Sequence, residues 1–354
     1  MRTGQVGVTV HDDKLAQPGF TLVTPLNCKA AYLIGMEGQI HHRWSFPLLP
    51  GNYAQLLPSG NLLWAGEVED GPSPGGGKGG LLREYDWEGN QVWEYADNAQ
   101  HHDFRRLRNG NTLYIGWEEM PAEAQARMIG AAPGSEDKDG LTWSDYMREV
   151  TPEGETAWEW HAHSDMVIED FPLNPLSTRA EFAHCNACTE LPDGNIMVSF
   201  RKISTIAIID KKTKKTIWHH RDEEWGQQHD CEVLENGNIL LFANGIHVPR
   251  GRFHSRAVEL DPETREEVWQ YMASPPYTFF SPNISGCQRL ANGNTLICEG
   301  LTGRIFEVTV EGRIVWEYIC PYFGRTKLGL ENAVFRAYRY AEGSPEIGQR
   351  LKLT

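Results

Sequence analysis

The sequence has no long apolar run and no excess of basic residues. No segment approaches the roughly 18 consecutive apolar residues that a membrane-spanning helix requires. The N-terminus from Met1 to Gln5 leads into mixed polar sequence, without the apolar core of a signal peptide. Lys and Arg total 33 against 48 Asp and Glu, which gives a net charge of −15. Because nucleic acids and anionic membranes are bound through positive fields, this balance argues against both as partners.

Cysteine is sparse, and its number is odd. Seven cysteines in a chain without an export signal are typical of reduced thiols in the cytoplasm, where we expect this protein to reside. Cys185 and Cys188 have the spacing of a zinc or redox motif. On a strand, however, residues three apart point to opposite faces, so we expect both to pack in the core.

Instead, the sequence is rich in repeated hairpin signals. Five segments share an extended stretch, a Gly-Asn turn and a second apolar stretch: 52–66, 102–116, 186–200, 229–243 and 285–299. Turns of this composition favour tight hairpins because they accept backbone φ above zero. A second type of hairpin alternates with the first and ends in tryptophan, at Trp44, Trp93, Trp158, Trp218, Trp269 and Trp316.

The period of the repeat predicts the fold. Successive tryptophans of the second hairpin type are 47 to 65 residues apart. A four-stranded unit repeating at about this period is a propeller blade. Six tryptophan hairpins meet five Gly-Asn hairpins, so the missing inner strands must come from the two chain ends, with residues 19–24 and 332–340 as candidates. We therefore predict an all-β, six-bladed propeller closed by pairing of the N- and C-terminal strands. A β-sandwich and a seven-bladed ring are the alternatives.

Two segments lengthen the regular repeat, at residues 118–144 and 161–182. We expect one propeller domain spanning residues 1–354, with both insertions over one face. Long insertions in a repeat array often gather on the binding face, although solvated variable loops would give the same pattern.

One repeat position is polar in every Gly-Asn segment. Seven residues before the turn triplet stand Asn52, His102, Asn186, His229 and Ser285. Inner strands line a propeller's channel, so these side chains should face one another across the axis, where a plain core would place Val or Ile. We expect them to form a functional site.

Two further residues should join this site. His184 lies two positions before Asn186, and a strand points both to the same side. Arg201 follows the second strand of the same hairpin and should return to the end of the blade that carries His184. Its planar guanidinium could neutralise an oxyanion there, whereas a surface salt bridge is the simpler alternative.

The segments 101–113, 183–202, 227–245, 288–300 and 303–318 resemble the arylsulfate sulfotransferases. The resemblance covers about residues 30 to 340. It implies a six-bladed propeller that moves a sulfuryl group from an aryl sulfate to a phenol, with no nucleotide sulfate donor and a transiently sulfated histidine. It also implies that His229 is the nucleophile and His102 the acid and base. His184, Asn186 and Arg201 would then bind the sulfuryl oxygens.

The same resemblance sets the expected class and partners. We expect a transferase with a small aromatic substrate, no cofactor and no metal, in a short form without the extra N-terminal β-domain of exported family members. Asn52 and Ser285 are the remaining substrate-binding candidates. A homo-oligomer is compatible with the sequence. A propeller polysaccharide lyase using the same channel residues and a non-catalytic binding propeller remain the alternatives.

Two motifs stand apart from this site. His161 and His163 have a spacing at which strand residues face the same side and could ligate a metal, but a polar loop is the simpler interpretation. The Gly-rich segment 71–80 lacks the strand, helix and Lys-Ser/Thr ending of a phosphate-binding loop. We expect a flexible loop between strands.

Overall fold

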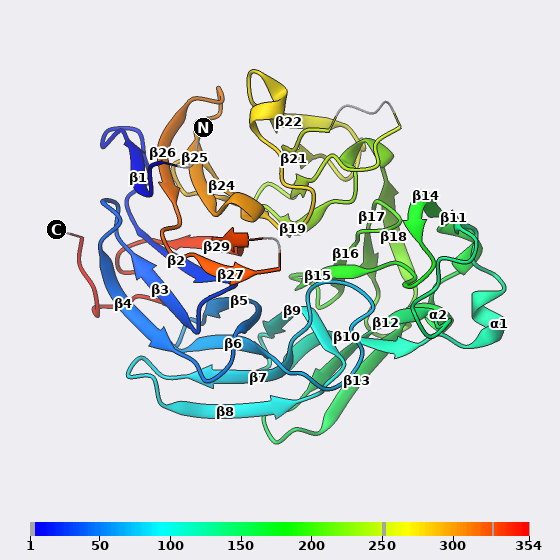
Figure 1. The fold of residues 1–354 in the computed structure, drawn as a ribbon. Helices are drawn as coiled ribbons and strands as arrows, with labels where there is room; N and C mark the ends of the chain where they lie inside the picture. Colours follow the sequence, from blue (N-terminus) through cyan, green and yellow to red (C-terminus); the bar gives the residue numbers. More distant parts are fainter. Residues whose placement is uncertain (1–3, 250–252, 328, 354) are drawn as a thin grey trace.

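The computed structural model describes residues 4–249, 253–327 and 329–353 of the chain. Six sheets of antiparallel strands stand as blades around one axis, so the six-bladed all-β propeller is confirmed (Figure 1). We number the blades from the N-terminus. From the channel outward, blade 1 consists of β29 (Val334–Tyr340), β2 (Phe20–Pro25), β3 (Ala30–Ile34) and β4 (Ile40–Ser45). Blade 2 consists of β5 (Pro50–Leu56), β6 (Leu62–Glu67), β7 (Gly80–Tyr85) and β8 (Gln91–Ala96). Blade 3 consists of β9 (Gln100–Arg106), β10 (Thr112–Glu119), β12 (Trp143–Val150) and β13 (Thr156–His161).

The other three blades continue the order along the chain. Blade 4 consists of β15 (Cys185–Glu190), β16 (Ile196–Phe200), β17 (Thr205–Ile209) and β18 (Thr216–Arg221). Blade 5 consists of β19 (His229–Val233), β20 (Ile239–Ala243), β21 (Arg256–Leu260) and β22 (Glu267–Tyr271). Blade 6 consists of β23 (Gly286–Arg289), β24 (Thr295–Glu299), β25 (Arg304–Val308) and β26 (Ile314–Ile319). A fifth strand, β1 (Gly7–His11), lies outside β26, and a short hairpin pairs β27 (Gly324–Thr326) with β28 (Gly329–Glu331).

Glycine explains why the inner hairpins form where the repeat predicts. The glycine of each Gly-Asn turn has a backbone φ between 85° and 89°: Gly60, Gly110, Gly194, Gly237 and Gly293. A side chain at such a φ is strained, so these glycines fix the turn and with it the register of the two strands.

Blade 1 is built from both ends of the chain. The last inner strand, β29, pairs antiparallel with β2, from Phe20 opposite Tyr340 to Pro25 opposite Val334. Figure 1 shows the red β29 beside the blue β2 and β3. This pairing replaces the sixth Gly-Asn hairpin and closes the ring, as the strand count predicts.

The six tryptophans of the outer hairpins all lie on the fourth strand of their blade, and each donates its indole N–H to a carbonyl in the next blade. The donor–acceptor distances are 2.8 to 3.2 Å, for Trp44 to Asp86, Trp93 to Pro152, Trp158 to Lys211, Trp218 to Pro262, Trp269 to Val310 and Trp316 to Met36. The last bond returns to blade 1. A closed circle of hydrogen bonds therefore links every blade to its neighbour.

Apolar packing fills the spaces between blades. Met197 and Ile206 of blade 4, for example, share one buried cluster with Leu241 and Val258 of blade 5. All seven cysteines are free, and Cys185 and Cys188 lie in the core cluster between blades 3 and 4. Among the described residues, no helix is both long and apolar enough to cross a bilayer.

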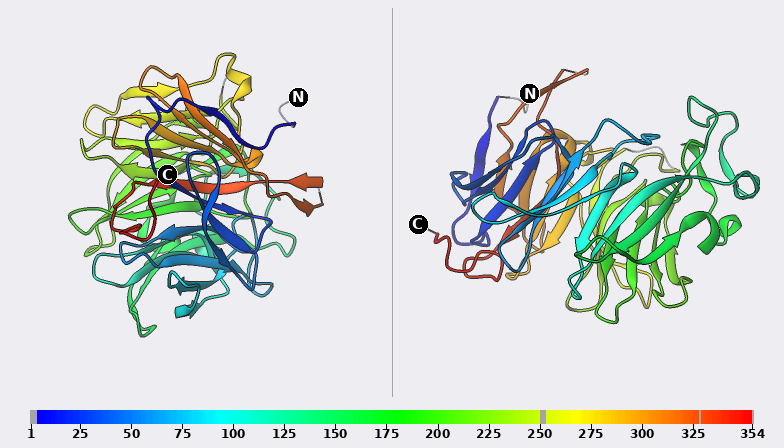
Figure 2. Two further views of the ribbon diagram at one scale, coloured as in Figure 1. Left: turned by 90° about the vertical axis from the view of Figure 1, so that its left-hand side faces the viewer. Right: turned by 90° about the horizontal axis from the view of Figure 1, so that it is seen from below.

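The two insertions meet each other beside blades 3 and 4. The first holds α1 (Ala122–Gln125) and β11 (Gly130–Ala132), and the second holds α2 (Ala162–Asp165) and β14 (Leu173–Thr178). β11 and β14 pair in parallel. These four elements lie toward the rim of the ring in the view down the channel, and Figure 2 shows them from two further sides. The end of the second insertion reaches the channel, where Glu181 contacts His184.

Candidate active site

Irregular backbone aims several polar side chains into the channel. The inner strands of blades 2 to 5 all carry bulges next to β6, β10, β16 and β20. His102 and His184 have backbone φ of 53° and 58°, a conformation that is strained for a residue other than glycine. Bulges and strain of this kind gather at functional sites, where they re-aim side chains. Regular pairing of the inner strand with its neighbour resumes within two or three residues, so the irregular backbone is confined to the part that faces the channel.

His229 is held in one orientation by Asn244. The His229 Nδ1 lies 2.7 Å from Asn244 Oδ1. The Asn244 Nδ2 donates to the carbonyls of Ser281 and Ile284 at 2.8 and 3.0 Å, so only its oxygen can face the ring. His229 must therefore carry its proton on Nδ1, which leaves the Nε2 lone pair free. Burial first, then the charge of Arg201, hold the pKa of His229 well below its ordinary value.

His102 belongs to a chain of three imidazoles. His101 Nδ1 lies 2.8 Å from His102 Nδ1, and His102 Nε2 lies 3.2 Å from His184 Nε2. The chain ends at Glu181, whose Oε2 is 2.8 Å from His184 Nδ1. Three neutral rings supply one proton for each of these three contacts. At the other end of the chain, His101 Nε2 lies 3.3 Å from the buried Asp145 Oδ1, and this fourth contact is left without a proton when all three rings are neutral.

Electrostatics favours the neutral state of His102 and His184. Burial lowers the pKa of His102 well below its ordinary value, and the neighbouring His184 lowers it further. Burial also lowers the pKa of His184, although Glu181 opposes the shift. Burial alone would raise the pKa of Glu181, but His184 and Lys202 hold it below its usual range. The Lys202 Nζ lies 3.1 Å from Glu181 Oε2. Glu181 is thus a buried carboxylate that orients His184.

Arg201 and Asn186 each keep an unused polar group in this environment. The Arg201 Nε and the Asn186 Oδ1 are buried and have no hydrogen-bond partner among the described residues. Asn186 Nδ2 donates to the Gln228 carbonyl at 2.8 Å. A buried guanidinium nitrogen without a partner costs free energy unless a ligand satisfies it. The Arg201 side chain is half-buried with an enclosed Nε, it forms no salt bridge with the other described residues, and it supplies positive charge beside neutral histidines.

Asn52 holds the backbone of the site. Its Nδ2 donates to the Gly77 carbonyl at 3.0 Å and to the His102 carbonyl at 3.1 Å, which engages both amide hydrogens within the protein. Ser285 is fully buried, and its hydroxyl oxygen accepts a hydrogen bond from the Gly300 N–H at 3.0 Å. In this state both residues support loops, and Ser285 retains a hydroxyl hydrogen.

The Gly-rich segment 71–80 covers His102. The His102 N–H donates to the Gly77 carbonyl at 2.7 Å. Gly77 has a φ of +91°, and a Cβ added there would come within 2.3 Å of the His102 ring. The segment does lie between strands, β6 and β7, as the sequence indicates. It has a further role that the sequence did not reveal, because its glycines permit close contact with the histidine cluster.

A charged layer forms the floor beneath the histidines. Arg336 on β29 is fully buried and lies 3.1 Å from Asp103 and 3.3 Å from Asp230, through NH1 and Nε respectively. Its NH2 group also donates to the Asn186 carbonyl at 2.7 Å. Phe335, the residue before it, contacts the rings of His102 and His229. The closing strand thus pairs a cation with two buried carboxylates, which Arg105 also approaches, and packs Phe335 against both histidines.

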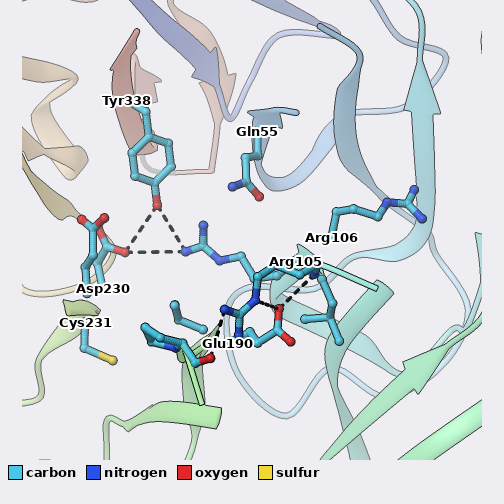
Figure 3. A pocket seen from close by; sticks show the side chains of 12 residues that line it. Gln55, Arg105, Arg106, Glu190, Asp230, Cys231 and Tyr338 are labelled. Carbon is cyan, nitrogen blue, oxygen red and sulfur yellow. Dashed lines mark hydrogen bonds and ion pairs between the residues drawn. The ribbon is translucent and has the colours of Figure 1, made fainter. Parts of the chain in front are cut away.

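The opposite mouth of the channel contains a separate cavity of about 340 Å³. Figure 3 shows the Arg105 guanidinium facing both the Tyr338 hydroxyl and the Asp230 carboxylate, which also contact each other. Glu232 lies on the cavity wall, and desolvation followed by the charge of Asp230 raises its pKa to about 7. The layer formed by Arg336 and its two aspartates lies between this cavity and the histidine cluster.

The structure brings most of the predicted residues together at one end of the channel. His102 and His184 are in direct contact, while Arg201 lies near enough to lower the pKa of His102 and of His229. The three histidines are only 2% to 4% exposed, so the site is closed over in this state. Glu181, Asn244, Arg336, His101 and Lys202 were not among the predicted site residues.

The fold and the site together define a six-bladed propeller with a histidine-rich site at one end of its channel. The sequence matches the arylsulfotransferase (ASST) family over residues 54–320, well over half of the chain. The chain therefore belongs to this family, and the membership supports an arylsulfotransferase type of activity, that of a transferase. A comparison with curated proteins found no match.

Several solved structures resemble this chain at low sequence identity. A protein of unknown function from Bacteroides caccae has a TM-score of 0.58 and 15% identity, covering 91% of this chain and 99% of that chain. A streptogramin B lyase has a TM-score of 0.49 and 11% identity, covering 96% and 94%. A virginiamycin B lyase from Staphylococcus aureus has a TM-score of 0.47 and 12% identity, covering 91% and 86%. At 15% identity the likeness to the Bacteroides caccae protein concerns the fold alone.

Proposed function

We propose that this protein transfers a sulfuryl group from an aryl sulfate to a phenolic acceptor through a sulfated His229. The observation that carries the proposal is the Asn244 contact, because it leaves the Nε2 lone pair of a neutral imidazole free. The nearby charge of Arg201 and its unpaired Nε support it as well, since a sulfuryl group presents anionic oxygens. Family membership favours the same reaction class.

The first half of the reaction forms a nitrogen–sulfur bond. His229 Nε2 donates its lone pair to sulfur, and the bond between sulfur and the aryl oxygen breaks with its electron pair on oxygen. A leaving phenol with a high pKa takes a proton from the pair His102 and His184 in its protonated form. Arg201 neutralises charge on the sulfuryl oxygens as they move.

The second half returns the enzyme to its starting state. An acceptor phenol gives its proton to the neutral pair His102 and His184, and its oxygen attacks sulfur as the bond to His229 breaks. The pair thus loses one proton in the first half and regains one in the second. Glu181 holds His184 in the orientation that makes this exchange possible.

Mass spectrometry tests the covalent step directly. Incubation with an aryl sulfate and no acceptor should release phenol and leave one sulfuryl adduct on the peptide that contains His229. His229→Asn should abolish the adduct. His102→Asn should retain it and slow transfer, most of all for poorly acidic leaving groups. His219→Asn, a substitution on the outer strand β18, serves as the matched control and should change neither result.

Two outcomes would contradict the proposal. If phenol is released only when donor and acceptor are both present, and no adduct forms, the transfer is direct rather than covalent. If no aryl sulfate gives phenol or adduct, the reaction class itself is wrong. Absorbance of an unsaturated uronate product would then identify the polysaccharide lyase alternative.

A further inference from the structure

Three side chains with metal-binding atoms converge on blade 3, outside the histidine cluster. Glu118 lies near the end of β10, His161 ends β13, and His163 belongs to α2. His161 Nδ1 is 2.9 Å from Glu118 Oε1, and His163 Nε2 is 3.4 Å from the same oxygen. One ligand atom from each residue lies within 4.8 Å of the other two. Each side chain is 20% to 29% exposed, so an ion could enter from solvent and still be partly shielded.

The chemistry of these groups matches a particular class of ion. Two imidazoles and one carboxylate are a common ligand set for Zn²⁺, which binds nitrogen and oxygen at about 2.0–2.2 Å. Ligand atoms that lie 2.9 Å to at most 4.8 Å apart can surround an ion at that radius with small side-chain adjustments. A site with three protein ligands leaves the fourth position of a tetrahedron to water.

The positions of these residues at the starts of the two insertions indicate what a bound ion would do. Glu118 begins the first insertion and His161 begins the second, although the two residues are 43 positions apart. The backbone N–H of His161 donates to Asp165 Oδ2 at 2.9 Å, which fixes the turn that carries His163. Further out, the insertions pair through β11 and β14. An ion bound where the insertions begin would attach both of them to blade 3, in addition to the contact that they make through β11 and β14.

We propose that Glu118, His161 and His163 bind one Zn²⁺ ion, which clamps the bases of the two insertions together. The ion holds the two insertions to the blade and takes no part in the transfer at His229. The alternative is a histidine–glutamate cluster held by hydrogen bonds alone. The zinc site and the hydrogen-bonded cluster differ in whether the folded protein binds a divalent metal at this position. A measurement that is independent of activity can decide between them.

The experiment uses the full chain, freed of metal by a chelator and then titrated with Zn²⁺ by calorimetry and with Co²⁺ by visible absorption. We expect one equivalent of Zn²⁺ and a tetrahedral or five-coordinate Co²⁺ spectrum. Glu118→Gln keeps the size of the side chain and should weaken binding by about 100-fold or more, because a ligand is lost. His163→Ala should do the same.

A matched control distinguishes this site from incidental surface histidines. His219 and His220 are adjacent on β18, and the double substitution of both by Ala should leave the stoichiometry and affinity unchanged. Zn²⁺ should also raise the melting temperature of the native chain but not of Glu118→Gln. Absence of binding to the native chain overturns the proposal. Equal binding by native and Glu118→Gln protein overturns it too, because the ion would then lie elsewhere.

Discussion

The His229 imidazole and the Asn244 amide form a hydrogen bond in which only one arrangement of protons is possible. Since both hydrogens of Asn244 Nδ2 are engaged by carbonyls, its oxygen must accept the His229 Nδ1 proton at 2.7 Å. The nucleophilic character that we assign to His229 therefore depends on a residue fifteen positions further along the chain, on the loop that follows β20. Asn244 positions His229 and does not need to contact the substrate.

Replacing Asn244 should show whether this residue orients the His229 ring or only stabilises the fold. Asn244→Ala should lower kcat/KM on the order of 100-fold, because a misplaced reacting group costs about that much. Asn244→Asp keeps an acceptor but adds a negative charge, which raises the pKa of His229. The acid limb of its pH–rate profile should then move to higher pH. A purely structural role would lower the melting temperature of both variants and leave the pH profile of the residual activity unmoved.

The pH dependence should differ between good and poor leaving groups. The pKa of His229 lies well below its ordinary value of 6.5, so the imidazole stays neutral as the pH falls through 6.5. For an acidic leaving phenol, kcat/KM should therefore remain flat across that range and decline only at lower pH. For a weakly acidic phenol the rate should rise as the pH falls, because the pair His102 and His184 must carry a proton. Matched pH profiles with a nitrophenyl and an unsubstituted phenyl sulfate check this, and identical profiles would exclude the pair as the acid.

Arg201 should be sensitive to the shape of its cation as well as to its charge. Arg201→Lys retains a positive charge but loses the planar set of N–H donors. We expect kcat to fall about 100-fold, in the range found for loss of one donor to an oxyanion. Arg127→Lys, at an exposed ion pair with Glu169, is the control and should be neutral. Steady-state rates of the two variants decide the matter, and equal rates would remove Arg201 from the site.

The close contact between Gly77 and His102 predicts a large effect of one methyl group. Gly77→Ala places a Cβ about 2.3 Å from the His102 ring at a φ of +91°, so the loop or the ring must move. Gly89→Ala has nearly the same φ, +87°, with no atom within 4 Å. Both variants should lose about 1 kcal/mol of stability from backbone strain. Only Gly77→Ala should also lose activity, and equal kcat/KM for the two variants would contradict the contact.

The circle of indole hydrogen bonds can be tested in the same paired manner. Trp316 and Trp64 are both fully buried, but Trp316 donates to the Met36 carbonyl while the Trp64 indole nitrogen has no partner among the described residues. Substitution of either by Phe removes a similar volume. Trp316→Phe should cost about 1 kcal/mol more, because it also leaves a carbonyl unsatisfied. Denaturant unfolding of both variants measures the difference, and equal losses would mean that the bond contributes nothing.

The sequence predicted the ring because the ring is repetitive. Gly-Asn turns and outer tryptophans recur in register, so the strand that supplies His102 could be aligned with the one that supplies His229. Asn52 also aligned, but alignment reports only the position in the channel. It could not reveal that both amide hydrogens of Asn52 hold backbone carbonyls.

The missed residues come from parts of the chain that do not repeat. Glu181 belongs to an insertion, and Arg336 lies on the one inner strand that no Gly-Asn turn follows, so neither had an aligned counterpart. Asn244 lies beyond the end of a repeat segment. A buried polar residue such as Arg336 within the strand pattern VFRAYRY was the only available signal, and its partners Asp103 and Asp230 follow the aligned histidines directly.

The strand that completes the ring also carries a second cation for its channel. During synthesis on the ribosome, Asp103 and Asp230 emerge long before Arg336, so five finished blades would hold two buried acidic groups that share Arg105, 3.6 Å from Asp103 and 4.0 Å from Asp230. One cation shared between two carboxylates would leave that unfinished ring incompletely stabilised. Arrival of β29 supplies the missing hydrogen bonds and the second positive charge in one event. Proteolytic removal of this single strand should therefore loosen the blades on the far side of the ring as well as the one it belongs to.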